Sequence, residues 1–213
     1  MQGFDMLPFR RILILAPHTD DAELGCGGLI NRASRENIIV EVVCFSSAQE
    51  SIPKEFPRDQ TTREFESSMR FLGVRSFECL SVPVRSFPEH RQAILDKLIS
   101  VRSHKYDLVC IPSRTDVHQD HQVVCREAIR AFKGTTIFGY ELPWNQLSND
   151  NTCLVKLTDQ DISAKARSLA MYETQKGRPY VDPVFIESLA RVRGIQCGSE
   201  FAENYEVLRW VIN

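Results

Sequence analysis

The sequence predicts an α/β fold in which a mostly parallel β-sheet is covered by helices on both faces. Short, nearly continuous apolar runs of strand length alternate with longer segments whose apolar residues recur at helical spacing. Strands without a polar face are typical of parallel sheets buried on both sides. The 213 residues contain no Pro/Gly/Ser-rich linker, internal repeat or low-complexity tract, so we expect one domain over residues 1–213.

The first half of the chain supports this order element by element. Residues 12–15 and 38–45 are apolar runs, and a helical pattern between them starts near Leu24 and extends to Arg35. Residues 46–57 are polar, contain two prolines and are typical of a loop. The next elements are a helix over 58–72 that stops at Gly73, a strand over 77–82, a helix over 89–101 and a strand over 108–111.

The second half continues the alternation. Thr158 is the expected N-cap of one helix, because acidic residues follow it in the first turn. The first predicted element is a helix through Val124, Ala128 and Ile129 to about 132, and strands over 135–140 and 152–157 follow. The last three are a helix from 158 to about 174, a helix through Phe185, Leu189 and Val192 to near Gly194, and a strand over 206–212. This order predicts a Rossmann-like three-layer fold, in which ligands bind at the carboxyl ends of the strands.

The first polar cluster lies at the turn between the first strand and its helix. His18, Asp20, Asp21 and Glu23 fall within six residues there. Adjacent carboxylates beside an imidazole repel each other unless a positive charge lies between them, and a divalent cation commonly supplies it. These ligand types suit Zn²⁺, with Fe²⁺, Co²⁺ and Mn²⁺ as alternatives. The competing interpretation is helix capping, since Asp and Glu favour the first helical turn.

Three glycines follow this cluster. Gly25, Gly27 and Gly28 indicate that the backbone comes close to other backbone or to a ligand. Nucleotide loops also use glycines, but the Gly-x-Gly-x-x-Gly order and the Lys-Ser/Thr ending are absent here. Acidic groups at this turn would also repel a phosphate, so we rank nucleotide binding below metal binding.

The second polar cluster follows the strand over 108–111. It contains Asp116, His118, Asp120 and His121 at the start of a helix. Strand-to-helix turns from two strands of one parallel sheet can meet at its carboxyl edge, so we expect both clusters to share one cleft. His118 and His121 are three residues apart and face the same side of a helix. A catalytic zinc needs three protein ligands and an open position, and His18, Asp21 and His121 would supply that number.

Composition bounds the partners and the compartment. A formal net charge of −2 gives no reason to expect nucleic acid as a partner, so a small molecule is the default. The 7 cysteines form no CxxC pair and lie mostly in apolar runs, which is typical of reduced core residues in a cytoplasmic protein. No uncharged apolar span reaches membrane length, so we expect no membrane insertion. Trp144 is equally consistent with a pocket wall and with ordinary packing, and the oligomeric state stays open.

Read as motifs, the two clusters resemble the signatures of the PIG-L (LmbE-like) metal-dependent deacetylases. The stretches are His18-Thr19-Asp20-Asp21-Ala22-Glu23-Leu24-Gly25-Cys26-Gly27-Gly28 and His118-Gln119-Asp120-His121. Arg63 to Glu66 ahead of Leu72-Gly73 is similar to the family's RxxE helix, residues 165–175 to its post-core helix, and residues 191–203 to its C-terminal segment. Where the family often has proline, this chain has Thr19, which we expect to alter loop stiffness more than chemistry.

The resemblance implies a role for each matching residue. His18, Asp21 and His121 correspond to the family's zinc ligands. Asp20 corresponds to the general base that deprotonates the metal-bound water. The cofactor implied is therefore Zn²⁺, with the other divalent cations named above as alternatives.

The remaining matches concern the transition state and the substrate. His118 corresponds to the histidine that, as imidazolium, stabilises the oxyanion or protonates the leaving amine, and Asp120 to a residue that orients it. Arg63 matches an arginine used on substrate hydroxyls. The implied reaction removes the N-acetyl group from an amino-sugar derivative of the N-acetylglucosamine kind, giving a free amine and acetate. Alternatives are an amidase or deformylase acting on a non-sugar N-acyl amine, a non-catalytic metal-binding protein and a nucleotide-binding protein.

Overall fold

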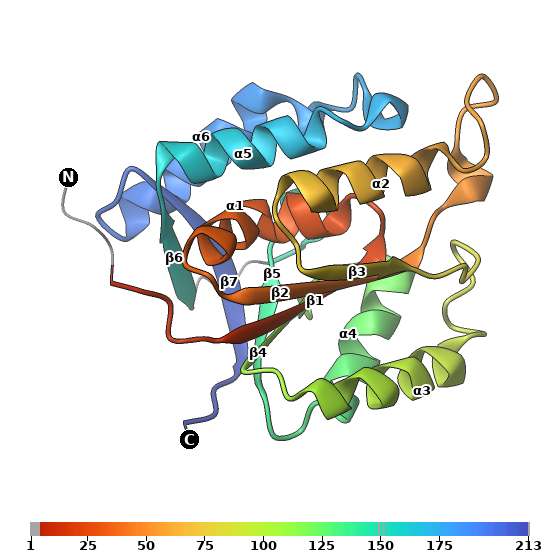
Figure 1. Ribbon diagram of the computed structural model, residues 1–213, viewed down its shortest axis with the longest axis horizontal. Helices are drawn as coiled ribbons and strands as arrows, with labels where there is room; N and C mark the ends of the chain where they lie inside the picture. Colours follow the sequence, from red (N-terminus) through yellow and green to blue (C-terminus); the bar gives the residue numbers. More distant parts are fainter. Residues whose placement is uncertain (1–4, 149, 151, 213) are drawn as a thin grey trace.

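The computed structural model describes residues 5–148, 150 and 152–212 and confirms the α/β fold (Figure 1). Its strands form a seven-stranded sheet in the order β3-β2-β1-β4-β5-β7-β6. Strands β1 to β5 pair in parallel, whereas β7 pairs antiparallel with β5 and with β6. The strands are β1 (Arg11–His18), β2 (Ile39–Ser46), β3 (Ser76–Cys79), β4 (Leu108–Pro112), β5 (Thr136–Tyr140), β6 (Cys153–Leu157) and β7 (Phe201–Arg209).

Helices cover both faces of the sheet, with α3 and α4 below it and the other α-helices above it in Figure 1. The α-helices are α1 (Asp21–Arg35), α2 (Gln60–Phe71), α3 (Arg91–Val101), α4 (Gln119–Ala131), α5 (Asp159–Leu169) and α6 (Pro183–Gln196). Short 3₁₀ helices are η1 (Gln49–Ser51), η2 (Arg102–His104), η3 (Pro143–Asn145), η4 (Glu173–Gln175) and η5 (Pro179–Val181). None of the helices in the described part of the chain has the length and apolar character needed to cross a bilayer.

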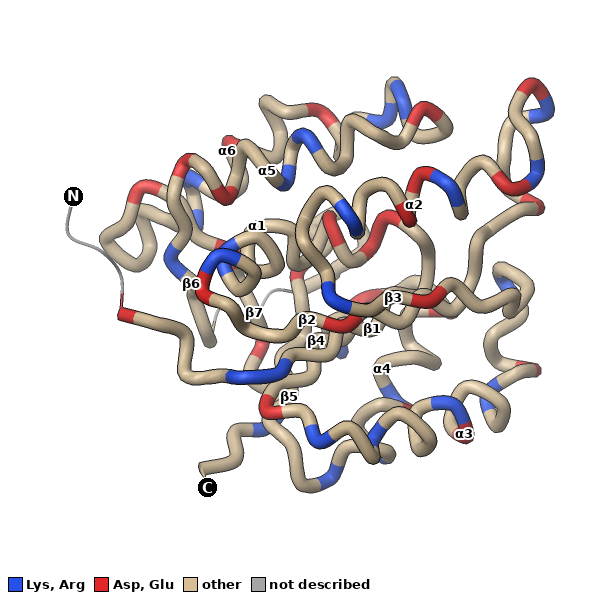
Figure 2. The backbone as a smooth tube through the Cα atoms, viewed as in Figure 1, with Lys and Arg blue, Asp and Glu red and all other residues tan. Residues whose placement is uncertain are grey.

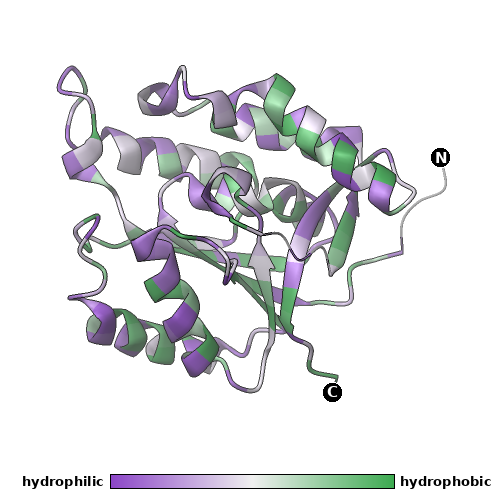
Figure 3. Ribbon diagram, turned by 180° about the vertical axis from the view of Figure 1, so that it is seen from behind, coloured by the Kyte–Doolittle hydropathy of each residue, from purple (hydrophilic) through white to green (hydrophobic). Residues whose placement is uncertain are grey.

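The core is divided by the sheet into two apolar clusters. Ile12 and Ile14 of β1 belong to the cluster under α1, α2, α5 and α6, whereas Leu13 and Leu15 belong to the cluster under α3 and α4. This alternation follows from the period of two along a strand, and it explains why residues 12–15 of β1 are apolar on both faces. Figure 3 shows the same pattern, with apolar strands inside and helices that are apolar only in part.

The sheet also determines where a site can form. Strand β1 lies between β2 and β4, so the chain first builds the sheet in one direction from β1 and then returns to build it in the other. The carboxyl ends of β1 and β4 flank this change of direction, where α/β sheets leave a crevice. Positions of basic and acidic residues are interspersed along the outer helices (Figure 2), in keeping with the small net charge.

Several predicted boundaries are wrong. The first strand reaches His18 rather than residue 15, and the first helix starts at Asp21 rather than near Leu24. The helix expected to reach about 174 ends at Leu169, because the chain turns there and buries Tyr172 beneath the polar cluster. The closing strand begins at Phe201 rather than 206, since its first half contains the buried polar residues Glu203 and Asn204, which break the apolar pattern. The strand expected over 77–82 is only Ser76–Cys79.

Candidate metal centre and active site

The two polar clusters meet at the carboxyl ends of β1 and β4. His18 is the last residue of β1, Asp21 is the first of α1, and His118 is the N-cap of α4. The imidazole centroid of His18 lies 5.1 Å from that of His118 and 5.2 Å from that of His121. Segments about one hundred residues apart in the sequence therefore form one site, at the position the topology predicts.

Three donor atoms form a nearly equilateral triangle at the centre of this site. His18 Nδ1, His121 Nε2 and Asp21 Oδ2 are each 3.3 Å from the other two. Tetrahedral zinc with bonds of about 2.0–2.1 Å holds its ligands roughly 3.3–3.4 Å apart, so the triangle has the size of one face of such a site. His118 lies close enough that the three histidines each offer a nitrogen within 4.8 Å of the others. The donor set thus fits a divalent cation.

The other nitrogen of each imidazole in the triangle contacts a buried carboxylate. His121 Nδ1 lies 2.8 Å from Asp116 Oδ2, and His18 Nε2 lies 3.2 Å from Asp120 Oδ2. When these outer nitrogens carry the imidazole proton and donate hydrogen bonds to the carboxylates, the nitrogens in the triangle present lone pairs. The prediction that Asp120 orients His118 through its side chain is wrong, because the Asp120 carboxylate contacts His18 instead. Only the backbone N–H of Asp120 donates to His118 Nδ1, at 3.2 Å.

The site favours positive charge. Burial lowers the pKa of His18, but hydrogen bonds to Asp120 and Asp21 outweigh it and raise that pKa to about 9. Burial is likewise outweighed at His121, where the Asp21 and Asp116 carboxylates raise the pKa to about 10. Without a cation the carboxylates therefore hold protons on both imidazoles. A divalent cation would take the place of those protons.

Asp20 and His118 have shifted pKa values suited to proton transfer and hydrogen-bond donation. Burial and the neighbouring Asp21 charge raise the pKa of Asp20 to about 6, close to the value that a base needs near neutral pH. Burial and the charges of His121 and His18 lower the pKa of His118. Since His118 Nδ1 accepts the Asp120 N–H, the neutral ring carries its proton on Nε2. Nε2–H can then donate to a ligand.

The polar residues at the start of α1 are not ordinary capping residues. Asp20 occupies the N-cap position without a side-chain capping bond, and Asp21 Oδ2 accepts from the backbone N–H of His18 at 2.8 Å. The glycines allow close packing of this helix, but the groups that approach them are side chains rather than the backbone or ligand that the sequence predicted. A Cβ added at Gly25 would lie 2.3 Å from the Tyr140 ring.

Glu23 contributes to the support of the site rather than to the donor triangle. It is fully buried, and burial raises its pKa to about 8. The Tyr172 hydroxyl lies 2.5 Å from the Thr19 carbonyl oxygen and 2.7 Å from Glu23 Oε1, and the Ser68 hydroxyl donates to the same carboxyl oxygen. These hydrogen bonds stabilise the backbone of the turn between His18 and Asp20. Sequence reasoning missed them because nothing in the local pattern links Tyr172 to that turn.

An open pocket with about 1060 Å³ of empty space lies over the donor triangle. Trp144 lines it and also packs against Tyr180 and Phe185, so both interpretations of this residue hold. Arg85 and Arg178 line the pocket as well. The structure does not bring Arg63 to this pocket. Its side chain is 67% exposed and its Nη2 lies 2.6 Å from Asp59.

Comparison with solved structures agrees with the fold. N,N'-diacetylchitobiose deacetylase from Pyrococcus horikoshii, in complex with its inhibitor MPG, superposes with a TM-score of 0.81 at 20% identity, over 96% of this chain and 87% of that one. The conserved protein TT1542 from Thermus thermophilus gives 0.79 at 23% identity, over 95% and 96%. GalB, the 4-carboxy-2-hydroxymuconate hydratase from Pseudomonas putida KT2440, gives 0.72 at 17% identity, over 96% and 98%.

The family model of PIG-L, described as GlcNAc-PI de-N-acetylase, matches residues 13–132. This range includes both polar clusters and ends just after α4. The chain therefore belongs to the PIG-L family.

Proposed function

We propose that the protein is a metal-dependent deacetylase that hydrolyses the N-acetyl group of an amino-sugar derivative. The observation that carries the proposal is the donor triangle of His18, Asp21 and His121 beside Asp20, a carboxyl group whose pKa is near 6. Family membership supports deacetylation as the reaction. A structural zinc is usually closed by four ligands, whereas three donors facing a pocket leave a position free.

His18, Asp21 and His121 would hold the cation, with Zn²⁺ as the first choice and Fe²⁺, Co²⁺ or Mn²⁺ as alternatives. A cation bound there supplies Lewis acidity, which polarises the amide carbonyl and lowers the pKa of the attacking water from ~15.7 towards ~7. Asp116 and Asp120 hold the two imidazoles in the required tautomers through their outer nitrogens.

Asp20 and His118 supply the proton transfer and the charge stabilisation. Asp20 accepts a proton from the attacking water as its oxygen bonds to the acyl carbon. The Nε2–H of His118 donates to the developing oxyanion, and losing one such donor typically costs ~10²–10³-fold in rate. Asp20 then returns its proton to the amine nitrogen as the C–N bond breaks, giving acetate and the free amine.

The test is acetate release by metal-loaded protein from a panel of N-acetylhexosamine derivatives, with acyclic N-acetyl and N-formyl amines as further substrates. We expect Asp20→Asn to lower kcat by at least ~10²-fold while metal content is kept. Asp59→Asn is the matched control, because Asp59 is also an N-cap aspartate without a side-chain capping bond but lies outside the pocket lining. Equal rates for Asp20→Asn and the unaltered protein would refute the role of Asp20, and release from acyclic amines alone would refute the sugar.

A further inference from the structure

Two aromatic side chains form a wall of the pocket that holds the donor triangle. Trp144 and Tyr180, here called the aromatic wall, stack with ring centroids 4.6 Å apart and an interplanar angle of 16°. Phe185 of α6 packs edge-on against Trp144 at 6.1 Å and 60°. Both members of the wall line the same pocket as His18, Asp20 and His118. The aromatic wall is therefore an apolar surface in the same pocket as the polar and charged groups of the donor triangle.

The position of Trp144 is tied to the metal-site loop. Trp144 lies in η3, whose last residue, Asn145, accepts a hydrogen bond from the backbone N–H of Val117 at 2.9 Å. Gln146 forms an isolated β-bridge with Asp116, the residue that contacts His121. The indole is thus held at a set place relative to the reacting groups, so a ligand that contacts it loses little additional freedom from the protein side.

Trp144 still keeps 40% of its surface exposed. Tyr180 covers one face of the indole, Phe185 packs against it edge-on, and Trp144 is among the residues that line the pocket. Other exposed apolar side chains differ in this respect. Leu147, three residues further on, is 87% exposed but does not line the pocket. A half-exposed, well-held indole inside a pocket is the usual arrangement for contact with a ring that has one apolar face.

A pyranose has that character, because its axial C–H bonds form an apolar face while its hydroxyls point to the rim. The negative π-face of an indole attracts such weakly positive C–H groups. We propose that Trp144 is the platform on which the sugar ring of the substrate stacks, and that it selects cyclic N-acetyl amines over acyclic ones. This inference rests on the proposed function for the nature of the ring and assigns Trp144 as a substrate-positioning residue.

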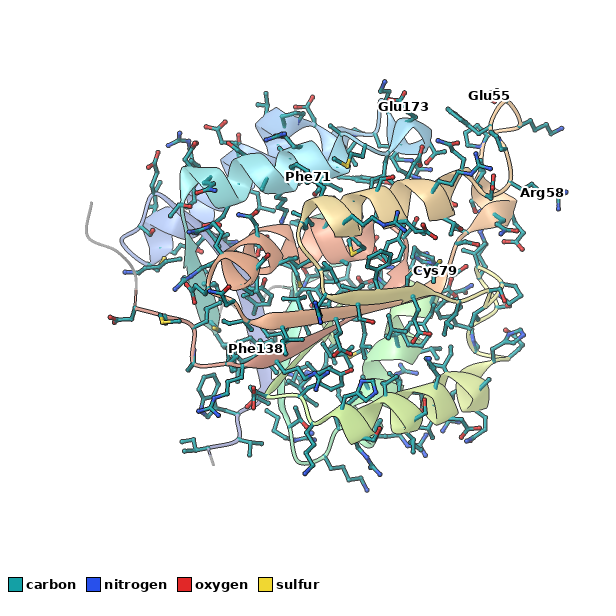
Figure 4. All side chains as sticks on the ribbon, viewed as in Figure 1. Glu55, Arg58, Phe71, Cys79, Phe138 and Glu173 are labelled. Carbon is teal, nitrogen blue, oxygen red and sulfur yellow. The ribbon has the colours of Figure 1, made fainter. Side chains whose placement is uncertain are left out.

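The chain offers a direct probe of this contact, since it has only 2 tryptophans, Trp144 and Trp210. Trp210 stacks on Phe138 with centroids 5.7 Å apart. Figure 4 labels Phe138 well to the left of Cys79. Cys79 is the last residue of β3 and marks the edge of the sheet where the carboxyl ends of the parallel strands, and therefore the pocket, lie. Trp210→Phe therefore leaves a protein whose tryptophan fluorescence reports on the pocket alone.

The first experiment titrates Trp210→Phe protein with the methyl glycoside of N-acetylglucosamine and with N-acetylethanolamine as the acyclic probe. Both titrations are made on chelator-treated and on metal-loaded protein. We expect a saturable change in Trp144 emission with the glycoside and none with the acyclic amide, whether or not metal is present. A saturable response to both probes, or to neither, overturns the platform.

The second experiment measures steady-state hydrolysis of the glycoside. Trp144→Ala should raise KM by about two- to tenfold with kcat within about threefold, as expected for loss of one stacking contact. Trp144→Phe should restore most of the affinity, and Leu147→Ala on the same loop should change nothing. Hydrolysis with unchanged KM in Trp144→Ala refutes the platform and leaves the deacetylase intact. A glycoside-specific fluorescence response without hydrolysis of any N-acetyl sugar supports the platform and refutes the deacetylase.

Discussion

Replacing Asp116 by Asn tests whether the carboxylate that contacts His121 Nδ1 supports cation binding by the donor triangle. Asp116 is 2% exposed; one carboxylate oxygen lies 2.8 Å from His121 Nδ1, and the other accepts the backbone N–H of His118 at 2.8 Å. Asparagine has one acceptor oxygen in place of two. If the new NH₂ group faces His121, the imidazole must shift its proton to Nε2, which removes the lone pair from the triangle. If the NH₂ group instead faces the backbone N–H of His118, two hydrogen-bond donors face each other in a buried environment.

Either outcome weakens cation binding without removing a ligand. Loss of such a carboxylate partner typically costs ~10–100-fold in metal affinity, which is ~1.4–2.7 kcal/mol. We expect this shift for Asp116→Asn in Zn²⁺ titrations against a chromogenic chelator. Asp161→Asn is the matched control, because Asp161 is also a fully buried aspartate that accepts a backbone N–H, from Thr158 at 2.9 Å, but it lies in α5 away from the site. An Asp116→Asn protein that binds Zn²⁺ as tightly as the unaltered chain would refute the reasoning.

Two further predictions concern stability and the support of the turn. Gly25→Ala should lower the free energy of unfolding in urea by ~1–3 kcal/mol, since its Cβ would lie 2.3 Å from the buried Tyr140 ring. Gly134→Ala should be nearly neutral, because no atom of the described residues, apart from its chain neighbours, lies within 4 Å of the added Cβ. Equal effects of the two substitutions would contradict the packing argument. Tyr172→Phe removes the hydroxyl that contacts the Thr19 carbonyl and Glu23, and should cost ~1–3 kcal/mol together with a several-fold loss of kcat. Tyr106→Phe, which removes a 2.8 Å bond to Glu41 at the other end of the sheet, should lower stability but leave kcat unchanged.

The fold could be predicted largely from the sequence because its central strands have no polar face. An apolar run such as residues 12–15 has few alternatives to a buried parallel strand, and the structure has a strand there, although it is longer and runs from Arg11 to His18. Prediction failed where charged residues are buried in pairs. The carboxylate of Glu203 in β7 accepts from the backbone N–H groups of Gly28 and Leu29 and from Lys165 Nζ at 2.8–2.9 Å. These partners are 38 to 175 residues away, so no local pattern could reveal them.

The site was predictable to the level of its motifs but not of its hydrogen bonds. Fold topology explains why the two histidine clusters meet. It does not determine that Asp120 reaches His18 rather than His118, because that depends on how the first turn of α4 approaches β1. Arg63 shows the opposite case, where a motif match lies on a helix whose arginine points to solvent and pairs with Asp59. Motif spacing specifies residue types, whereas side-chain direction is decided by packing.

The groups proposed to perform the reaction and the groups proposed to contact the substrate come from different parts of the chain. The donor triangle, Asp20 and His118 all lie within residues 13–132, the range that the family model matches. Trp144, Arg178 and Tyr180 lie beyond it, in or beside the short helices η3 and η5 that connect late elements, yet they line the same pocket. Loops attached to a rigid sheet can change without moving the residues that the strands hold. Family membership therefore supports the chemistry at the strand ends, and the nature of the substrate has to be determined from the aromatic wall and its surroundings.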